Sequence, residues 1–279
     1  MRIRRRWLKP FQIDSASFAT SALPYVNESI TEVEYATKTL GAVGVALTSN
    51  HEGKYLGNPD FAPFFAQMEA MNAIVFVHPA IPLLAEVGGI FLLASPTVYL
   101  PVSAIIIFTG IHSTVFMCKG LFEFFFETGK QMVLIWSMSG FDDMQVARTF
   151  IDLALSGTLQ NLTNINYIVP HVGGSLPSII DRSIAGRSDD DNAAIMEAFH
   201  TRCWWDSAGV TYAHQIGGLL AYNISPSFLL YGSDFPWVPA SVLDLAFDAI
   251  ATSPFLDDIQ KQAMRSENVK RLFAGKIQF

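Results

Sequence analysis

The sequence has few cysteines and lacks the defining motifs of three common enzyme classes. Cys118 and Cys203 are the only cysteines among 279 residues, and no CxxC spacing occurs. This excludes a disulfide-rich scaffold and a local Cys-type zinc site, and it favours a reducing, cytoplasmic compartment. There is also no Walker A loop, no GxSxG nucleophile elbow and no GxGxxG turn. P-loop ATPases, serine hydrolases and dinucleotide-binding enzymes are therefore not indicated.

A basic excess is also missing. Eighteen Lys and Arg residues stand against 25 Asp and Glu residues, so the net charge is −7. A nucleic-acid partner is not expected, because its electrostatic footprint would be basic. The one basic cluster, "MRIRRRWLKP" at residues 1–10, is interpreted as a solvated tail. No apolar core of a signal peptide follows it, so secretion is not expected either.

Charge is absent from a long internal stretch. Residues 87–118 contain no Asp, Glu, Lys or Arg. About 20 apolar residues suffice to cross a bilayer, so the stretch is long enough to span one. Pro96, Pro101 and the absence of a second such span argue against a membrane protein.

The rest of the chain alternates strand-like and helix-like segments. Strands are expected at 42–50, 73–79, 166–170, 202–208 and 228–237, and helices at 60–72, 146–159 and 257–273. Such alternation predicts an α/β fold with a parallel sheet, either doubly wound or closed into a barrel.

Four of the apolar runs are followed by a histidine or an aspartate near a turn residue. These are His78, His171, Asp206 and Asp234. In a parallel barrel the carboxyl ends of the strands meet on one face, where catalytic groups from different strands come together. Imidazole and carboxylate are ligand types for Zn²⁺ or a similar divalent ion. For His171 alone, a core histidine bonded to a backbone carbonyl would be the favoured interpretation, by about two to one.

Three motifs in this order, "FVHP" (76–79), "HVGGSLP" (171–177) and "YGSDFP" (231–236), resemble the amidohydrolase superfamily, in its amidohydrolase-2 decarboxylase branch. Residues 39–65 are most similar to the 6-methylsalicylate and gamma-resorcylate decarboxylase type, and "ENVKRLF" resembles the closing helix of the family. The resemblance covers roughly residues 18–86 and 146–275.

The resemblance implies a distorted (β/α)8 barrel of the metal-dependent hydrolase type, formed as one domain over residues 1–279. It implies one divalent metal ion, Zn²⁺ first and Mn²⁺ second, with His78 and Asp234 as ligands. Asp234 would also move a proton, and His171 would act as a further catalytic acid. Asp206 would support the site. His51 and Lys54, in the loop after an earlier strand, would contact the substrate.

The chain departs from the family pattern in two places. The family opens with a strand ending in HxH or ExH, which supplies two more metal ligands, and no such motif occurs. An incomplete barrel, short of two strands, is therefore expected. Residues 87–120 and 129–145 interrupt the pattern, and we interpret them as atypical insertions, possible translated introns; a membrane-embedded insertion is the alternative.

These observations predict a metal-dependent, non-oxidative decarboxylase, a carboxy-lyase acting on a small aromatic carboxylic acid such as a salicylate derivative. A metal-dependent hydrolase of the same superfamily is one alternative, because a metal-bound hydroxide could serve a similar site. An inactive fragment, or a non-catalytic membrane-associated protein, is the other. A homodimer is possible, and membrane association is not expected.

Overall fold

The computed structural model describes residues 16–80, 131–209, 211–234 and 240–277. Residues 87–120, which we interpret as an insertion, lie outside the described residues. Within the described ranges, no helix is both long enough and apolar enough to cross a membrane.

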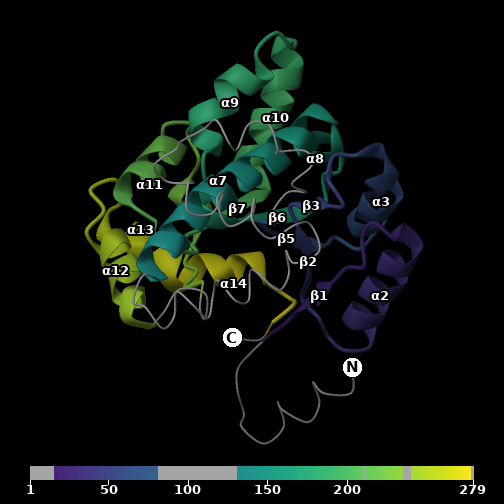
Figure 1. The fold of residues 1–279 in the computed structure, drawn as a ribbon, viewed down its shortest axis with the longest axis horizontal. Coiled ribbons are helices and arrows are strands. Elements are labelled where there is room, and N and C mark those ends of the chain that lie inside the picture. The colour runs from purple at the N-terminus through teal and green to yellow at the C-terminus, as the bar shows by residue number, and fades with distance from the viewer. Residues whose placement is uncertain (1–15, 81–130, 210, 235–239, 278–279) are drawn as a thin grey trace, which may run out of the picture.

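The centre of the molecule is a parallel sheet, which has six strands in the described part of the chain (Figure 1). Their order follows the sequence: β1 (Phe18–Thr20), β2 (Gly44–Thr48), β5 (Ile74–His78), β6 (Asn166–Val169), β7 (Cys203–Asp206) and β8 (Leu229–Leu230). Neighbouring strands that also follow one another in the chain require helical crossovers, which confirms the predicted α/β architecture.

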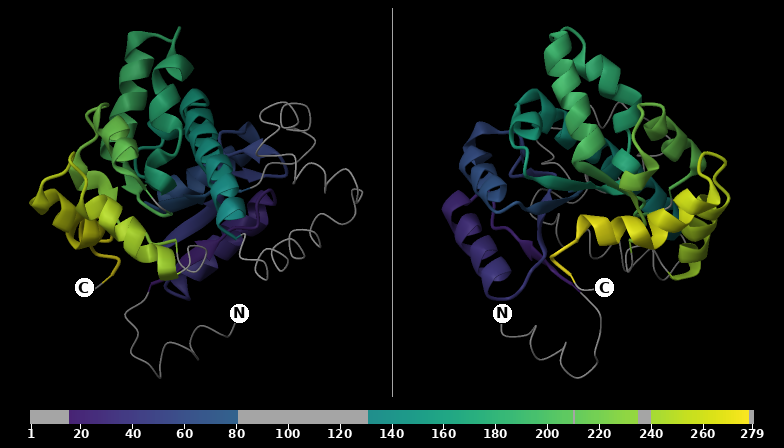
Figure 2. Two further views of the ribbon diagram at one scale, coloured as in Figure 1. Left: turned by 60° about the vertical axis from the view of Figure 1, so that its left-hand side comes forward. Right: turned by 180° about the vertical axis from the view of Figure 1, so that it is seen from behind.

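Helices surround this sheet, as two further views show (Figure 2). They are α2 (Val26–Lys38), α3 (Ala62–Ala70), α7 (Gln131–Leu155), α8 (Thr158–Asn161), α9 (Leu176–Ile184), α10 (Asp189–Thr201), α11 (Ala213–Leu220), α12 (Ala240–Ala251), α13 (Asp258–Gln262) and α14 (Asn268–Leu272). A short hairpin, β3 (Asn50–His51) with β4 (Lys54–Tyr55), follows β2. Short 3₁₀ turns, η1 (Pro59–Phe61), η3 (Pro170–Gly173) and η4 (Pro226–Phe228), and the π-helical turn η5 (Ala263–Glu267) complete the fold.

The two faces of the sheet bury different side chains, because successive residues of a strand point to opposite sides. One face packs into the large helix-covered core through residues such as Val75, Tyr167 and Trp205. The other face carries Ile74, Phe76, Ile168, Trp204 and Leu230. His78 and Asp206 have the same alternation as this second set and stand at its carboxyl edge. The second face is therefore the one that leads to the candidate site.

The C-terminal segment packs against this second face. Leu272 and Phe273 are buried in the same cluster as Ile74 and Trp204. The Phe273 ring contacts Phe18 of β1 edge to face, with centroids 6.0 Å apart. Strands β1 and β8 form the two ends of the sheet, so the six described strands do not close into a ring. The C-terminal residues thus cover apolar surface that this open sheet would otherwise expose.

Phe273→Ala is expected to destabilise the fold by about 3 kcal/mol, because it removes a buried aromatic ring and leaves a cavity. Urea unfolding followed by circular dichroism measures this change. The matched control is Ile259→Ala, a truncation of a side chain that is 82% exposed, which should change the free energy of unfolding by less than about 0.5 kcal/mol. Equal effects of the two variants would show that the C-terminal segment does not hold the sheet.

Helix α7 begins well before the predicted start at residue 146. It runs from Gln131 to Leu155, so it includes most of the stretch 129–145 that we interpret as an insertion. Near the end of that stretch, Gln145 is buried and its Oε1 accepts a hydrogen bond of 2.7 Å from Tyr55 Oη. Residues 142–145 therefore pack as part of the fold, and the origin of the stretch as an insertion stays a prediction.

Candidate active site

The candidate site lies at the carboxyl edge of the sheet, where four neighbouring strands deliver side chains. His78 is the last residue of β5 and Asp206 is the last residue of β7. His171 and Asp234 follow β6 and β8 by two and four residues. Their charges act on one another: burial raises the pKa of Asp234 and of Asp206, and the charge of His171 opposes both rises, joined at Asp234 by that of His78. The structure thus brings together the four residues that the strand ends predict.

His78 is held in one tautomer by its own chain. Its Nδ1 lies 2.7 Å from the carbonyl oxygen of Pro79, which can only accept a hydrogen bond. Nδ1 therefore carries the proton, and the lone pair of Nε2 remains available. This arrangement is the usual preparation of a histidine for binding a metal ion.

His171 sits in a strained left-handed turn. His171, Val172, Gly173 and Gly174 have φ angles of 54°, 52°, 84° and 56°. Glycine tolerates this conformation, but His171 and the β-branched Val172 adopt it at an energetic cost. Such strain is typical of functional sites, where the surrounding structure holds a side chain in place. The pair of glycines in "HVGG" is thus explained by the tight turn that presents His171.

A close approach at Gly174 fixes this turn to helix α7. A Cβ at Gly174 would lie 2.5 Å from Cα of Asp143, so only glycine fits there. The backbone N–H and the hydroxyl of Ser175 both donate to the Asp143 carbonyl oxygen, each at 3.2 Å. The turn and α7 are therefore joined at residue 143.

Two aspartates from α7, Asp142 and Asp143, enter the site and were missed by the sequence analysis. Asp143 Oδ1 lies 3.3 Å from Nδ1 of His171. Burial raises the pKa of Asp142, while the charges of His171 and His78 lower it. Two adjacent aspartates just before the predicted helix at 146–159 were the only signal of these residues in the sequence. Their place in the site depends on the path of α7 across the sheet edge, which the sequence pattern does not reveal.

Asp206 is held in place by the backbone around it. Its Oδ1 accepts a hydrogen bond of 2.7 Å from the backbone N–H of Ala208. A side chain at Gly232, on the neighbouring strand end, would overlap its carboxyl group. Burial raises the pKa of Asp206 from 3.8 to about 6, and the hydrogen bond from Ala208 and the charge of His171 oppose part of that rise.

Asp234 is a half-buried member of the cluster. Its φ angle of 57° places it in the left-handed region, which is uncommon for a residue other than glycine. Burial raises the pKa of its carboxyl group, against the charges of His171 and His78. Near neutral pH the raised pKa brings Asp234 closer to holding a proton, as a general acid requires.

The two predicted substrate residues lie on the β3–β4 hairpin. His51 stays close to the sheet edge: Thr48 Oγ1 is 3.3 Å from its Nε2, and Thr48 pairs with His78 in the strand register. Burial lowers the pKa of His51. Lys54 instead forms an exposed ion pair with Asp60 at 2.5 Å. Substrate contact by either residue stays a prediction.

Comparison with known proteins identifies the family of this fold and site. The family model described as "Amidohydrolase" matches residues 5–274. This chain belongs to the amidohydrolase family. A curated relative, the 6-methylsalicylic acid decarboxylase of Penicillium expansum, is 28% identical over 75% of this chain and 53% of its own length. The chain therefore spans about half the length of the curated relatives it matches.

Solved structures confirm the fold. An amidohydrolase II structure is 25% identical, covers 96% of this chain and 74% of its own, and has a TM-score of 0.69. A dihydroxybenzoic acid decarboxylase from Polaromonas, solved with bound manganese and the inhibitor 2-nitroresorcinol, is 17% identical, covers 100% of this chain and 76% of its own, and has a TM-score of 0.67. The latter similarity shows a shared fold.

The donor set of this amidohydrolase suits a divalent cation in type and in charge. Two imidazoles meet the carboxyl groups of Asp142, Asp143, Asp206 and Asp234, and a cation would relieve the repulsion among those carboxylates. The number of ligands is smaller than a catalytic zinc site usually has, which is three protein side chains. Within the described part of the chain, no three His, Cys, Asp or Glu side chains are arranged to hold a metal ion.

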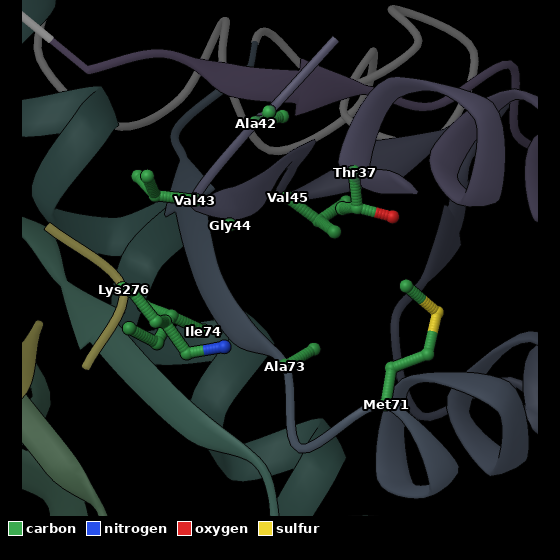
Figure 3. A pocket seen from close by; sticks show the side chains of 10 residues that line it. Thr37, Ala42, Val43, Gly44, Val45, Met71, Ala73, Ile74 and Lys276 are labelled. Atoms are coloured by element: carbon green, nitrogen blue, oxygen red, sulfur yellow. The ribbon is translucent and has the colours of Figure 1, made fainter. Parts of the chain in front are cut away.

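A pocket of about 270 Å³ lies at the opposite edge of the sheet (Figure 3). It is lined by Thr37, Gly41, Ala42, Val43, Gly44, Val45, Met71, Ala73, Ile74 and Lys276. Gly44 and Ile74 begin strands β2 and β5, whereas His78 ends β5. This pocket is therefore separate from the candidate site.

Asp206→Asn is expected to stabilise the metal-free amidohydrolase in a pH-dependent way. The native carboxyl keeps its proton up to about pH 6, whereas the unfolded one loses it near 3.8, so the stability of the wild type falls as the pH rises between these values. Asparagine does not ionise, so it removes this loss of stability. Its Oδ1 can still accept the hydrogen bond from the backbone N–H of Ala208. The free energy of unfolding of Asp206→Asn should equal that of the wild type near pH 3.5 and exceed it by about 3 kcal/mol at pH 7.

Urea unfolding in the presence of a chelator, at pH values from 3.5 to 7.5, measures the difference between the two proteins. Asp248→Asn, the same substitution on an exposed helix surface, is the matched control and should give no such slope. A gain of equal size at all pH values would contradict a raised pKa at Asp206.

Proposed function

We propose that this chain is a metal-dependent, non-oxidative carboxy-lyase that removes CO₂ from a small aromatic acid, such as a salicylate derivative. The observation that carries the proposal is the meeting of His78, His171 and Asp234 at one sheet edge. The similarity to 6-methylsalicylic acid decarboxylases supports the class of substrate.

The reaction requires two features of the site: a group that donates a proton to the ring carbon, and a positive charge beside the carboxylate of the substrate. A proton adds to the ring carbon that carries the carboxylate; the C–C bond then breaks, its electron pair returns to the ring, and CO₂ leaves. The raised pKa of Asp234 suits it to deliver that proton, and His171 can resupply it from solvent.

The surplus of carboxyl groups supports a role for a cation. An aromatic carboxylate would be repelled by Asp142, Asp143, Asp206 and Asp234 unless protons or a positive ion compensated their charge. His78 and Asp234 would hold that ion. When bound, a divalent ion supplies Lewis-acid stabilisation to the phenol and carboxylate oxygens of such a substrate. Manganese in structures of the same fold makes Mn²⁺ a candidate beside Zn²⁺.

The proposal is tested by product analysis. The purified chain is incubated with salicylate, 6-methylsalicylate and 2,6-dihydroxybenzoate in Mn²⁺ or Zn²⁺, and with aryl esters and lactones in parallel. Release of CO₂ with formation of the corresponding phenol supports a carboxy-lyase. Ester or lactone cleavage without CO₂ would instead establish the hydrolase alternative, and no product with any substrate would favour the inactive fragment.

The proposal also covers the cellular compartment and the oligomeric state of the enzyme. We place it in the cytoplasm, acting on a diffusible acid, with a homodimer as its possible assembly. Gel filtration with light scattering, and fractionation of cells that express the chain, test both statements.

A further inference from the structure

We propose that Asp143 is a positioning residue for His171, holding its imidazole in the tautomer whose Nε2 can exchange a proton in the site. The proposal rests on the proposed function for the use of that nitrogen, but the hydrogen bond itself can be observed without any activity.

The first support is the geometry of the pair. Asp143 Oδ1 lies 3.3 Å from Nδ1 of His171, and the two side chains are only 29% and 14% exposed. An ionised carboxylate can only accept, so Nδ1 must carry the proton in this contact. Nε2 is then the nitrogen that remains for chemistry. Histidines in active sites commonly depend on such a carboxylate partner for their orientation.

The second support is that both partners are fixed by backbone contacts. Ser175 donates twice to the carbonyl oxygen of Asp143, and Gly174 packs directly on its main chain. Helix α7 packs against η3 and α9, the two elements that flank Gly174 and Ser175 in the chain. The left-handed turn at His171 is therefore held in place from the same residue whose side chain contacts the ring.

The third support is the division of roles between two neighbouring aspartates. Both Asp142 and Asp143 favour the charged form of His171 through their charge, but of the two it is Asp143 that accepts a hydrogen bond from the ring. Burial of His171 opposes these effects, and the net shift of its pKa is upward. Asp142 thus offers a matched control, because Asp142→Asn removes the same charge from the same turn of α7 and leaves the hydrogen bond.

The test is ¹⁵N NMR of the imidazole rings in histidine-labelled, metal-free protein. The chain has six histidines, and His171→Gln assigns the signal of interest by its disappearance. The wild type and Asp142→Asn should show the Nδ1-protonated form of His171 with a slowly exchanging proton. Asp143→Ala should show a mixture of tautomers or fast exchange.

Kinetics supply the second readout. Asp143→Ala is expected to lower kcat for CO₂ release about 10- to 100-fold with KM within about threefold, and Asp143→Glu should restore part of the loss. Circular dichroism and the urea midpoint verify that each variant folds, and Asp143→Leu, which is similar in size and cannot accept a hydrogen bond, replaces Asp143→Ala if the latter does not.

The outcomes separate the two proposals. A His171 signal that is identical in the wild type and Asp143→Ala, or an unchanged kcat, would overturn the positioning role. Loss of the Nδ1–H signature in Asp143→Ala supports it even if no acid releases CO₂, a result that would overturn the proposed function alone.

Discussion

Replacing His171 by asparagine is expected to lower kcat for CO₂ release about 10²- to 10⁴-fold, the range by which a positioned acid or base accelerates proton transfer. The reason is structural as well as chemical. Asparagine tolerates the left-handed backbone at φ 54° and can still contact Asp143, so the turn should survive while the titrating imidazole is lost.

The measurement is steady-state CO₂ release against substrate concentration, with metal content determined for each protein. KM should change little, because a proton-transfer group contributes mainly in the transition state. His214→Asn, on the exposed start of α11, is the matched control and should keep wild-type kcat. A fall in metal content equal to the fall in kcat would show that His171 is a ligand and not an acid.

The pattern of strand ends allowed most of this site to be predicted. Strands β5, β6 and β7 are short apolar runs bounded by turn residues, and the polar group after each run belongs to the same sheet edge in any parallel arrangement. The sequence therefore placed His78, His171 and Asp206 together without knowledge of the helices. Strand β8 proved shorter than predicted, only Leu229–Leu230, because the N–H of the next residue, Tyr231, donates to the carbonyl oxygen of Met264 instead of to a strand.

Contacts made by helices across the sheet edge were beyond such a prediction. Asp142 and Asp143 follow no strand, and their place beside His171 arises from the path of α7 and the close approach at Gly174. Lys54 shows the opposite case. Its loop follows β2 as expected, but the two-residue turn of the hairpin, with Glu52 and Gly53 at positive φ, brings Lys54 to Asp60. Tertiary packing and local turn geometry, which a linear pattern does not encode, decide both cases.

Asp234→Asn is expected to weaken binding of Mn²⁺ or Zn²⁺ about 100-fold and to reduce CO₂ release by at least the same factor. A structural zinc ion gains about 10–16 kcal/mol from four ligands, which is roughly 3 kcal/mol for each. With His78 and Asp234 as the protein ligands, the wild type should bind with a Kd in the tens of micromolar, and loss of one ligand should raise it into the millimolar range.

Isothermal titration of the chelator-treated protein with each metal ion measures this affinity directly, without reference to activity. His78→Ala should give the same loss as Asp234→Asn, because Nε2 of His78 is the other donor and its Nδ1 is already committed to Pro79. His214→Ala, which removes an exposed histidine outside the proposed ligand set, serves as the control. Micromolar binding that survives both site variants would mean that the ion is held elsewhere. Since the carboxylates of Asp142, Asp143 and Asp206 would then stand uncompensated beside an anionic substrate, the carboxy-lyase assignment would lose its electrostatic basis.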